Sequence, residues 1–349
     1  MTALPNFFLR NLWYYALPSA ALNPCGMVTK TLLGEPILFC RGEDETVFAL
    51  RDVCPHRAMP LSYGAFDGNE VECCYHGWRF GRAGGCTHIP SLVGHEGVEP
   101  ANIRVRAYQV RETQGGIWVF MDDPKTKLAE LPPVPTIPDI AADASPAICE
   151  VMSFPCHADH AVAGLMDPAH GPFVHTSWWW RSRHSIHEKQ KPFGPSHLGF
   201  TMRRHKPSSN SFAYKLLGGA PETEISFQLP GVRIEHIRAG KHIVCGLTCV
   251  TPLNETESEV THAIYTDITW LKLFAPIARL FAHRFLAQDR GVVVKQQDGL
   301  KYEPNLMLIR DADTPARWYQ QLKNECARAQ IEGRAFVNPV KETVLRWRS

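Results

Sequence analysis

Two short cysteine–histidine pairs constrain this chain more than any other feature of its sequence. Cys54 and His56 form a C-x-H pair, and Cys73 and His76 form a C-x2-H pair further along. Each pair supplies one thiolate sulfur and one imidazole nitrogen, which suits a 2Fe-2S centre in which two Cys hold one iron and two His hold the other. The alternative is a tetrahedral zinc site, because two Cys and two His also form one.

The order of the ligands and the residues around them favour the iron–sulfur centre. Zinc sites usually place like ligands together, whereas each segment here contains one ligand of each kind. The segments CPHRAMPLSYG and CCYHGWRFGRAGGC resemble the two cluster loops of Rieske non-haem iron oxygenase large subunits. We therefore predict that Cys54, His56, Cys73 and His76 bind a Rieske 2Fe-2S cluster. Cys74 is not the predicted ligand, since it would leave C-x-H in the second loop.

A second metal site is indicated between Gly164 and His175, where the sequence reads GLMDPAHGPFVH. Asp167, His170 and His175 form a D-x2-H-x4-H array. Two imidazoles and one carboxylate make the facial triad that binds Fe(II) and leaves positions open for O2 and substrate. In a chain with 16 His, the H-x4-H spacing alone could join two unrelated histidines. The cluster motif and D-x2-H before it favour the mononuclear iron site.

The resemblance to Rieske oxygenases covers nearly the whole chain. The chain resembles the shorter type of large (alpha) subunit, found in vanillate O-demethylase and dicamba demethylase. The resemblance implies that Asp167 is a bridge, hydrogen-bonded to a triad histidine and to a cluster histidine of a neighbouring subunit, and not an iron ligand. It also implies that the iron's carboxylate comes from a later helix, and the segment LAQDRGVVV resembles its surroundings. We therefore predict His170, His175 and Asp289 as iron ligands, with Asp298 as the fallback. Either carboxylate could instead be a solvated side chain on a helix.

The activity that the resemblance implies is that of an oxygenase component. It would use O2, and electrons from a separate ferredoxin or flavin reductase, to hydroxylate or oxidatively demethylate an apolar, aromatic or polycyclic substrate, as in aromatic compound catabolism. The electrons would come from NAD(P)H oxidised elsewhere, because the sequence has no G-x-G-x-x-G fingerprint. The resemblance also implies a homotrimer arranged head to tail. A cis-dihydroxylating ring dioxygenase is the alternative, and a Rieske electron-transfer protein without catalytic iron is a third.

One departure from the resembling family concerns the residues shortly before the bridging aspartate. Relatives commonly have an asparagine there, close to the iron, where this chain has Ala163 and Gly164. A polar group that tunes ligand orientation would then be missing. If the segment is helical, His157, Asp159 and His160 lie a few turns upstream and could supply the polarity instead.

The proline-rich composition of 122–146, with six prolines, predicts a linker between two domains. We expect an all-β Rieske domain at 1–122, a proline-rich linker at 123–147, and an α+β catalytic domain at 148–349 with helices on an antiparallel, helix-grip-like sheet. Apolar runs separated by turn residues predict strands, and longer runs predict helices. The predicted strands are 36–40, 46–50, 116–120, 224–229 and 242–250, and the predicted helices are 159–175 and 271–300, the second of which could kink or start at Pro276.

Composition excludes several classes of partner. The net charge of +2 is spread along the chain without a basic stripe, so we expect no nucleic acid. The eleven Cys are scattered and odd in number, and no signal-peptide pattern is seen, so a cytoplasmic protein is expected. Charges interrupt the apolar stripe of the 271–300 helix, so it should not span a membrane. Core packing of that stripe, rather than contact with a membrane surface, is the preferred interpretation; its residues are Leu271, Phe274, Ile277, Ala278, Phe281 and Phe285.

Substrate hints are confined to the segment after the second triad histidine. Aromatic walls favour flat apolar ligands, and a following basic group could pair with a substrate carboxylate. Packing in the core or at a subunit contact, and a solvated basic turn, explain the same residues equally well. The residues are Trp178, Trp179 and Trp180, followed by Arg181, Arg183 and His184.

Overall fold

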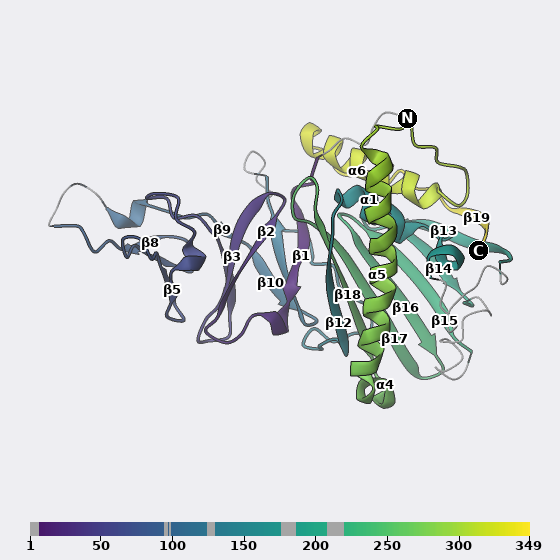
Figure 1. Cartoon of the computed structure of the whole chain (residues 1–349), viewed down its shortest axis with the longest axis horizontal. Coiled ribbons are helices and arrows are strands. Elements are labelled where there is room, and N and C mark those ends of the chain that lie inside the picture. Colours follow the sequence, from purple (N-terminus) through teal and green to yellow (C-terminus); the bar gives the residue numbers. More distant parts are fainter. Residues whose placement is uncertain (1–6, 94–96, 98, 124–129, 176–185, 208–219) are drawn as a thin grey trace. The chain divides into compact units, whose positions relative to one another are not determined.

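The computed structural model describes residues 7–93, 97, 99–123, 130–175, 186–207 and 220–349. The chain divides into two compact units (Figure 1). The N-terminal unit comprises Arg10–Val134 and Ala142–Ala144, and the C-terminal unit comprises Pro135–Ala141, Ser145–Ser349 and the residues before Arg10. The proline-rich segment predicted as a linker therefore contributes residues to both units, and the predicted domain boundaries stay a prediction.

The N-terminal unit consists of antiparallel strands in three small sheets, as the prediction of an all-β domain requires. The sheets have the strand orders β1-β11-β10, β2-β3-β4-β9 and β5-β6-β7-β8. The strands are β1 Leu12–Pro18, β2 Met27–Leu32, β3 Glu35–Arg41, β4 Val47–Arg51, β5 Ala65–Phe66, β6 Glu70–Glu72, β7 Arg79–Gly81, β8 Cys86–His88, β9 Ala107–Tyr108, β10 Val110–Thr113 and β11 Gly116–Met121. Short 3-10 turns lie at Ser19–Ala21, Leu61–Tyr63 and Pro100–Asn102.

Local sequence explains the turns and the core of this unit. Leu33 and Gly34 both have positive φ, which gives the two-residue turn that joins β2 to β3 with the twist that a hairpin needs. One apolar core is shared by strands β3 and β4 and the β5–β8 sheet, and it includes Leu61, Val71 and Phe80. The thiols of two candidate cluster ligands lie in this same core, so the loops that carry them are anchored by packing.

The C-terminal unit is built on one antiparallel eight-stranded sheet in the order β12-β18-β17-β16-β15-β14-β13-β19. Its strands are β12 Ile148–Phe154, β13 Glu188–Ser196, β14 Gly199–His205, β15 Glu222–Gln228, β16 Val232–Ala239, β17 His242–Pro252, β18 Ser258–Thr266 and β19 Thr343–Arg348. The helices are α1 Ala158–Met166, α2 Gly171–Val174, α4 Thr269–Leu273, α5 Ala275–Leu300 and α6 Thr314–Glu332. The long helix α5 lies across the strands of this sheet (Figure 1). The predicted α+β class is confirmed.

The helix predicted at 159–175 is interrupted. α1 ends at Met166, and Asp167 has the extended φ and ψ of −71° and 114°. Pro168 follows it, and a residue before proline is disfavoured in the helical conformation. Helical structure resumes only in the short α2, so the D-x2-H segment forms a bend and not a continuous helix.

The helix predicted at 271–300 is also divided, with Phe274 between α4 and α5. α5 begins at Ala275, next to Pro276, because proline fits the first turn of a helix. Of the two predicted roles of Pro276, a kink or a helix start, the structure shows the start. The prediction that the apolar stripe packs in the core is wrong for Phe274, Ile277 and Phe281, which are 51%, 52% and 44% exposed in the single chain. The buried residues of α5 are Ala282, Leu286 and Val293.

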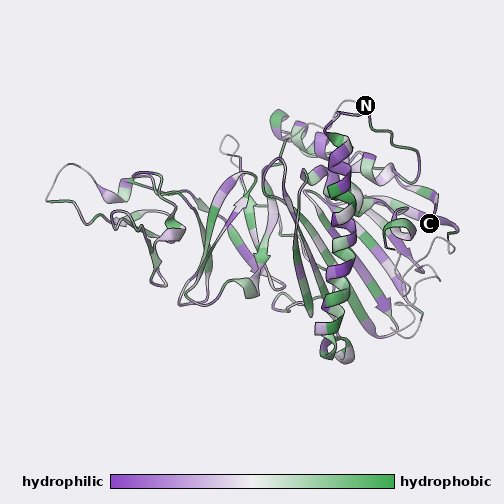
Figure 2. Cartoon of the chain, viewed as in Figure 1, coloured by the Kyte–Doolittle hydropathy of each residue, from purple (hydrophilic) through white to green (hydrophobic). Residues whose placement is uncertain are grey.

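Hydrophobic and hydrophilic residues are not separated into different helices or strands of this unit. Figure 2 shows polar and apolar residues interspersed along α5 and along the strands behind it. Among the described residues, no helix is long and apolar enough to cross a membrane.

Candidate metal centres

The two cysteine–histidine loops of the N-terminal unit are built on the same turn. In each loop the cysteine N–H donates to the carbonyl five residues later, at 2.8 Å, and the cysteine carbonyl accepts from the N–H four residues later, at 2.9 Å. The residue that closes each turn has positive φ, 57° at Ala58 and 68° at Gly77. Repetition of this turn explains why both Cys54 and Cys73 start a loop that curls back over its own cysteine.

The side chains of the two loops converge. The thiols of Cys54 and Cys73 are buried in the same core, and burial raises the pKa of Cys54 to about 11. Cys74 is exposed. The rings of His56 and His76 lie with centroids 4.5 Å apart. The structure therefore brings together the four predicted cluster residues and leaves the neighbouring cysteine outside.

A buried histidine nitrogen without a hydrogen-bond partner indicates whether these residues fit a cluster. His76 Nδ1 is buried and has no hydrogen-bond partner within the described part of the chain. His56 is held in place by Trp78, whose ring stacks on it at 4.5 Å and an angle of 5°. A buried polar atom usually has a partner, and a metal ion would supply it here. Two thiols and two imidazoles brought together by these two loops therefore fit a 2Fe-2S cluster.

The triad residues meet in the C-terminal unit. His170 and His175 flank α2, and Asp289 comes from α5. The distance between the two histidine Nε2 atoms is 3.2 Å, and Asp289 Oδ1 lies 3.6 Å from the first and 3.3 Å from the second. Donor atoms about 2.1 Å from one metal and at right angles to each other are about 3 Å apart. These three residues therefore fit a metal ion without rearrangement, and they form the one such group found among the described residues.

Carbonyl oxygens fix which nitrogen each histidine offers. His170 Nδ1 lies 2.8 Å from the Asp167 carbonyl oxygen, and His175 Nδ1 lies 3.1 Å from Gln288 Oε1. Because a carbonyl oxygen only accepts, each Nδ1 carries the proton and donates. Each Nε2 then has a lone pair directed at the other two triad residues, which is the tautomer that a metal site needs.

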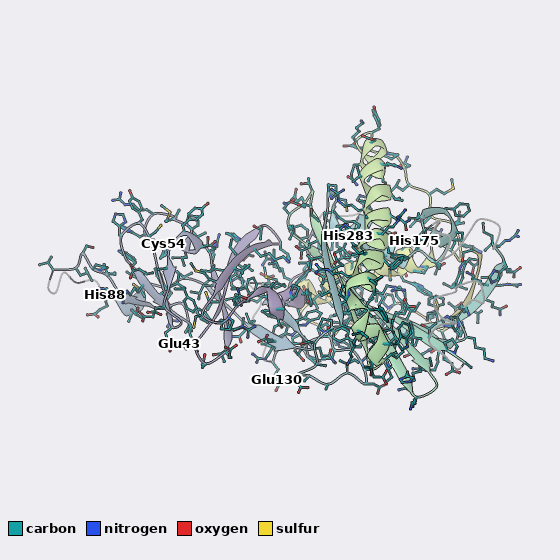
Figure 3. The ribbon with its side chains drawn as sticks, turned by 60° about the horizontal axis from the view of Figure 1, so that its bottom comes forward. Glu43, Cys54, His88, Glu130, His175 and His283 are labelled. Carbon is teal, nitrogen blue, oxygen red and sulfur yellow. The ribbon has the colours of Figure 1, made fainter. Side chains whose placement is uncertain are left out.

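Burial sets the electrostatics of the triad. It raises the pKa of Asp289 to about 6. Burial lowers the pKa of His170, but the carboxylates of Asp167 and Asp289 outweigh that effect and the net shift is upward. Phe285 stacks on the His175 ring at 3.6 Å and 15°, and His175 lies beside α5 in Figure 3. A cation bound there would compensate the buried carboxylate.

The other predicted carboxylates lie elsewhere. Asp167 Oδ1 accepts from the Ala169 N–H at 2.7 Å, and its Oδ2 lies 3.6 Å from His170 Nδ1. It therefore contacts the outer side of the ring, away from the Nε2 atoms. Asp298, the fallback ligand, has an 85% exposed side chain 3.6 Å from Lys301 and does not join the triad.

Of the three residues expected to replace the missing asparagine, Asp159 is placed away from the triad. Gly164 faces open space, since a Cβ there would meet nothing within 4 Å. Asp159 is directed at α6, where Lys323 Nζ lies 2.7 Å from its carboxylate and Tyr319 donates to it. Both charged side chains are 2% exposed. The idea that Asp159 supplies polarity to the iron site is therefore wrong, and its role is to join α1 to α6.

A cavity of about 420 Å³ opens on the triad between α5 and the sheet. Its apolar lining includes Phe193, Phe200, Phe227, Phe281 and Phe285. The sheet adds polar side chains, namely Arg233, Glu235, Thr248 and His262. Sequence reasoning missed these residues and Gln288. The aromatic and basic residues predicted to shape the substrate site, Trp178–Trp180, Arg181, Arg183 and His184, lie outside the described residues.

Comparison with known proteins agrees with these features. The Rieske [2Fe-2S] domain family matches residues 12–108. The dicamba O-demethylase oxygenase component of Stenotrophomonas maltophilia is 35% identical over 173 residues, 48% of this chain and 48% of that protein. The 4beta-methylsterol monooxygenase of Methylococcus capsulatus is 37% identical over 130 residues, 37% of this chain and 35% of that protein. The chain spans about half or less of the length of these curated relatives.

The same fold occurs in the crystal structure of dicamba monooxygenase bound to dicamba. The TM-score is 0.71, with 21% identity over 93% of this chain and 98% of that one. Residues 12–108 therefore form a Rieske domain, which implies a 2Fe-2S cluster rather than zinc, and the chain has the fold seen in dicamba monooxygenase. The predicted resemblance is confirmed, and the chain is homologous to proteins named as oxygenases.

Proposed function

We propose that this chain is the oxygenase component of a multicomponent Rieske system that hydroxylates or oxidatively demethylates an apolar, aromatic or polycyclic substrate. The observation that carries the proposal is the triad of His170, His175 and Asp289 at the wall of an apolar cavity, in a chain with a Rieske domain. A Rieske cluster alone transfers electrons. A second metal site beside a cavity supports an enzyme rather than an electron carrier.

The proposed metal ligands are Cys54, His56, Cys73 and His76 for the cluster and His170, His175 and Asp289 for the mononuclear iron. When bound, the cluster supplies electrons singly, and Fe(II) supplies the open positions at which O2 and substrate meet. The chain's own contribution is to hold the ligands. Gln288 and the Asp167 carbonyl accept the Nδ1 protons and so orient both rings, while Phe285 covers one face of His175 and keeps water from it.

Electron supply requires partners. The proposed source is NAD(P)H, through a separate ferredoxin or flavin reductase. The position of the Asp167 carboxylate on the outer side of His170 supports its proposed role as a bridge to a cluster histidine of a neighbouring subunit, in a head-to-tail homotrimer. The cytoplasmic location stays a prediction.

Iron content and oxygen incorporation test the proposal together. The purified chain, reconstituted with iron and sulfide, should hold three irons, two in the cluster and one at the triad. Turnover with ¹⁸O2, a reductase and a panel of apolar aromatic and polycyclic compounds should place one labelled oxygen atom in a hydroxylated product, or in the formaldehyde released by demethylation. Two labelled atoms would make the chain a cis-dihydroxylating dioxygenase instead. Two irons per chain and no product would make it an electron-transfer protein.

A further inference from the structure

The sheet wall of the cavity carries a short polar row across three neighbouring strands. Arg233 on β16 is opposite Thr248 on β17, and Thr248 is opposite His262 on β18. Side chains directly opposite each other in antiparallel strands lie on one face of the sheet, so all three face the cavity that they line. Thr248 Oγ1 lies 2.8 Å from His262 Nδ1. The pair and Arg233 form a polar strip in a cavity whose lining also contains several phenylalanine rings.

The row carries hydrogen-bonding capacity without net charge. Arg233 is paired with Glu235, two residues along the same strand, at 3.1 Å. Burial lowers the pKa of His262 to about 4, so the ring is neutral at pH 7. Two lysines also line the cavity, but Lys189 donates to Ser349 Oγ and Lys191 donates to the Lys206 carbonyl, each at 2.9 Å.

We propose that Thr248 and His262 form a subsite that binds the neutral hydroxyl or carbonyl oxygen of an otherwise apolar substrate. The proposal rests on the proposed function, because it takes this cavity as the substrate site. It adds to that function a chemical class: a lipophilic compound with an uncharged oxygen placed against the sheet, while the body of the molecule lies against the phenylalanine rings.

The donor and acceptor inventory favours a hydroxyl. A neutral imidazole has one donor and one acceptor nitrogen, and one bond joins it to Thr248. Among the described residues the pair makes no other side-chain hydrogen bond. If His262 Nδ1 donates, Nε2 can accept; if Thr248 donates, Nε2 carries the proton. At Nε2 a hydroxyl fits either tautomer because it both donates and accepts, whereas a carbonyl fits there only when Nε2 carries the proton; in the other tautomer a carbonyl would have to accept from the Thr248 hydroxyl.

A carboxylate fits poorly for a different reason. Moving an anion into a cavity costs desolvation free energy, which is recovered only where a cation is available to pair with it. At the pair itself, Arg233 already has a carboxylate partner and His262 is uncharged. The cavity lysines, Lys189 and Lys191, are on β13, three strands away from β16. The site should therefore bind a compound with a neutral oxygen more tightly than one with a carboxylate and more tightly than one without oxygen.

Equilibrium dialysis tests the subsite with naphthalene, 2-naphthol and 2-naphthoate, on the chain with its Rieske cluster assembled and the triad left without iron, so that no compound can bind through the metal. We expect 2-naphthol to bind about 2- to 10-fold more tightly than naphthalene, the gain of a neutral hydrogen bond, and 2-naphthoate to bind least. Thr248→Val and His262→Phe should each abolish the preference for 2-naphthol over naphthalene. Thr261→Val makes the same change on the opposite face of β18 and should keep the preference.

The proposal is overturned if 2-naphthoate binds most tightly, if 2-naphthol has no advantage over naphthalene, or if the advantage survives both substitutions. The last result would mean that the pair only satisfies its own hydrogen bond inside the sheet. Because no turnover is involved, these outcomes are independent of oxygenase activity. A chain that makes no product can still show the preference, and an active oxygenase can lack it.

Discussion

The two candidate metal centres use the same side chain through opposite nitrogens. At the triad, the Nδ1 atoms of His170 and His175 are taken by carbonyl oxygens, and the Nε2 atoms meet at 3.2 Å. In the N-terminal unit it is Nδ1 of His76 that is buried without a partner among the described residues. The nitrogen that the protein leaves unused is the one available to a metal.

The centres also differ in what positions their ligands. The cluster cysteines begin loops closed by backbone hydrogen bonds within each loop. The triad instead needs α5 to be packed correctly, because Asp289 and the Gln288 acceptor both come from that helix. The first centre should therefore respond to changes inside its loops, and the second to changes on a distant helix.

The largest expected effect is at the cluster. Cys73→Ser should remove both cluster irons and the visible and EPR signals of the Rieske centre, because its thiol is buried with that of Cys54. Cys74→Ser, one residue away and exposed, is the matched control and should keep the signals. Loss of the signals in the control alone would reverse the ligand assignment.

The triad should lose one iron when its helix ligand is removed. Asp289→Ala leaves two imidazoles, too few protein donors for a labile Fe(II), so iron should fall from three to two per chain while the Rieske spectrum persists. Asp298→Ala changes an exposed carboxylate of the same helix and should keep three. Equal iron loss in both variants would show that the helix, rather than the carboxylate, had been disturbed.

The sequence predicted those metal ligands that lie close to one another along the chain. The two cluster loops and the D-x2-H-x4-H array each fit within a few residues, so spacing alone proposes their chemistry. Asp289 is far along the chain, and only the family resemblance pointed to it. Gln288 could not be predicted as a histidine partner, because that contact exists only once α5 is packed against α2.

The fold shows the same limit. Strand runs such as 36–40 and 116–120 were predicted from local pattern and correspond to β3 and β11. The apolar stripe of α5 was misassigned to the core, because a periodic pattern shows that a helix has an apolar face and not what covers it. Ala282 and Leu286 are the buried residues on the sheet side of α5, while Phe281 and Phe285 of the stripe line the cavity there instead of a closed core. Likewise, Thr248 and His262 become neighbours only through the β17–β18 register.

A substitution of Asp167 tests whether this residue carries electrons between the two centres without being a ligand of either. Asp167→Asn keeps the size of the side chain but removes its charge and part of its capacity to accept hydrogen bonds. We expect three irons per chain and a chemically reducible cluster, with transfer of electrons to the triad slowed about 100-fold in single turnover. Loss of the triad iron would instead make Asp167 a ligand, and unchanged transfer would remove it from the electron path.

The smallest expected effect comes from the partner of a ligand rather than from a ligand. Gln288→Leu keeps the bulk of the side chain but removes the oxygen that accepts the His175 Nδ1 proton. The ring is then free to rotate or to place its proton on Nε2, so Fe(II) affinity at the triad should fall about 10-fold. Competition with a chelator, after the cluster has been assembled, measures this affinity while the Rieske spectrum reports the other centre.

Two further variants separate orientation of the ring from stability of the helix. Gln288→Glu keeps an oxygen acceptor at the same position and should retain wild-type Fe(II) affinity, because a carboxylate accepts from Nδ1 at least as well as an amide does. Gln296→Leu makes the same change as Gln288→Leu at an exposed position of α5 and should also leave the affinity unchanged. If Gln288→Leu binds Fe(II) as tightly as wild type, packing against Phe285 alone orients His175. The triad would then depend on the packing of α5 but not on a hydrogen bond from it.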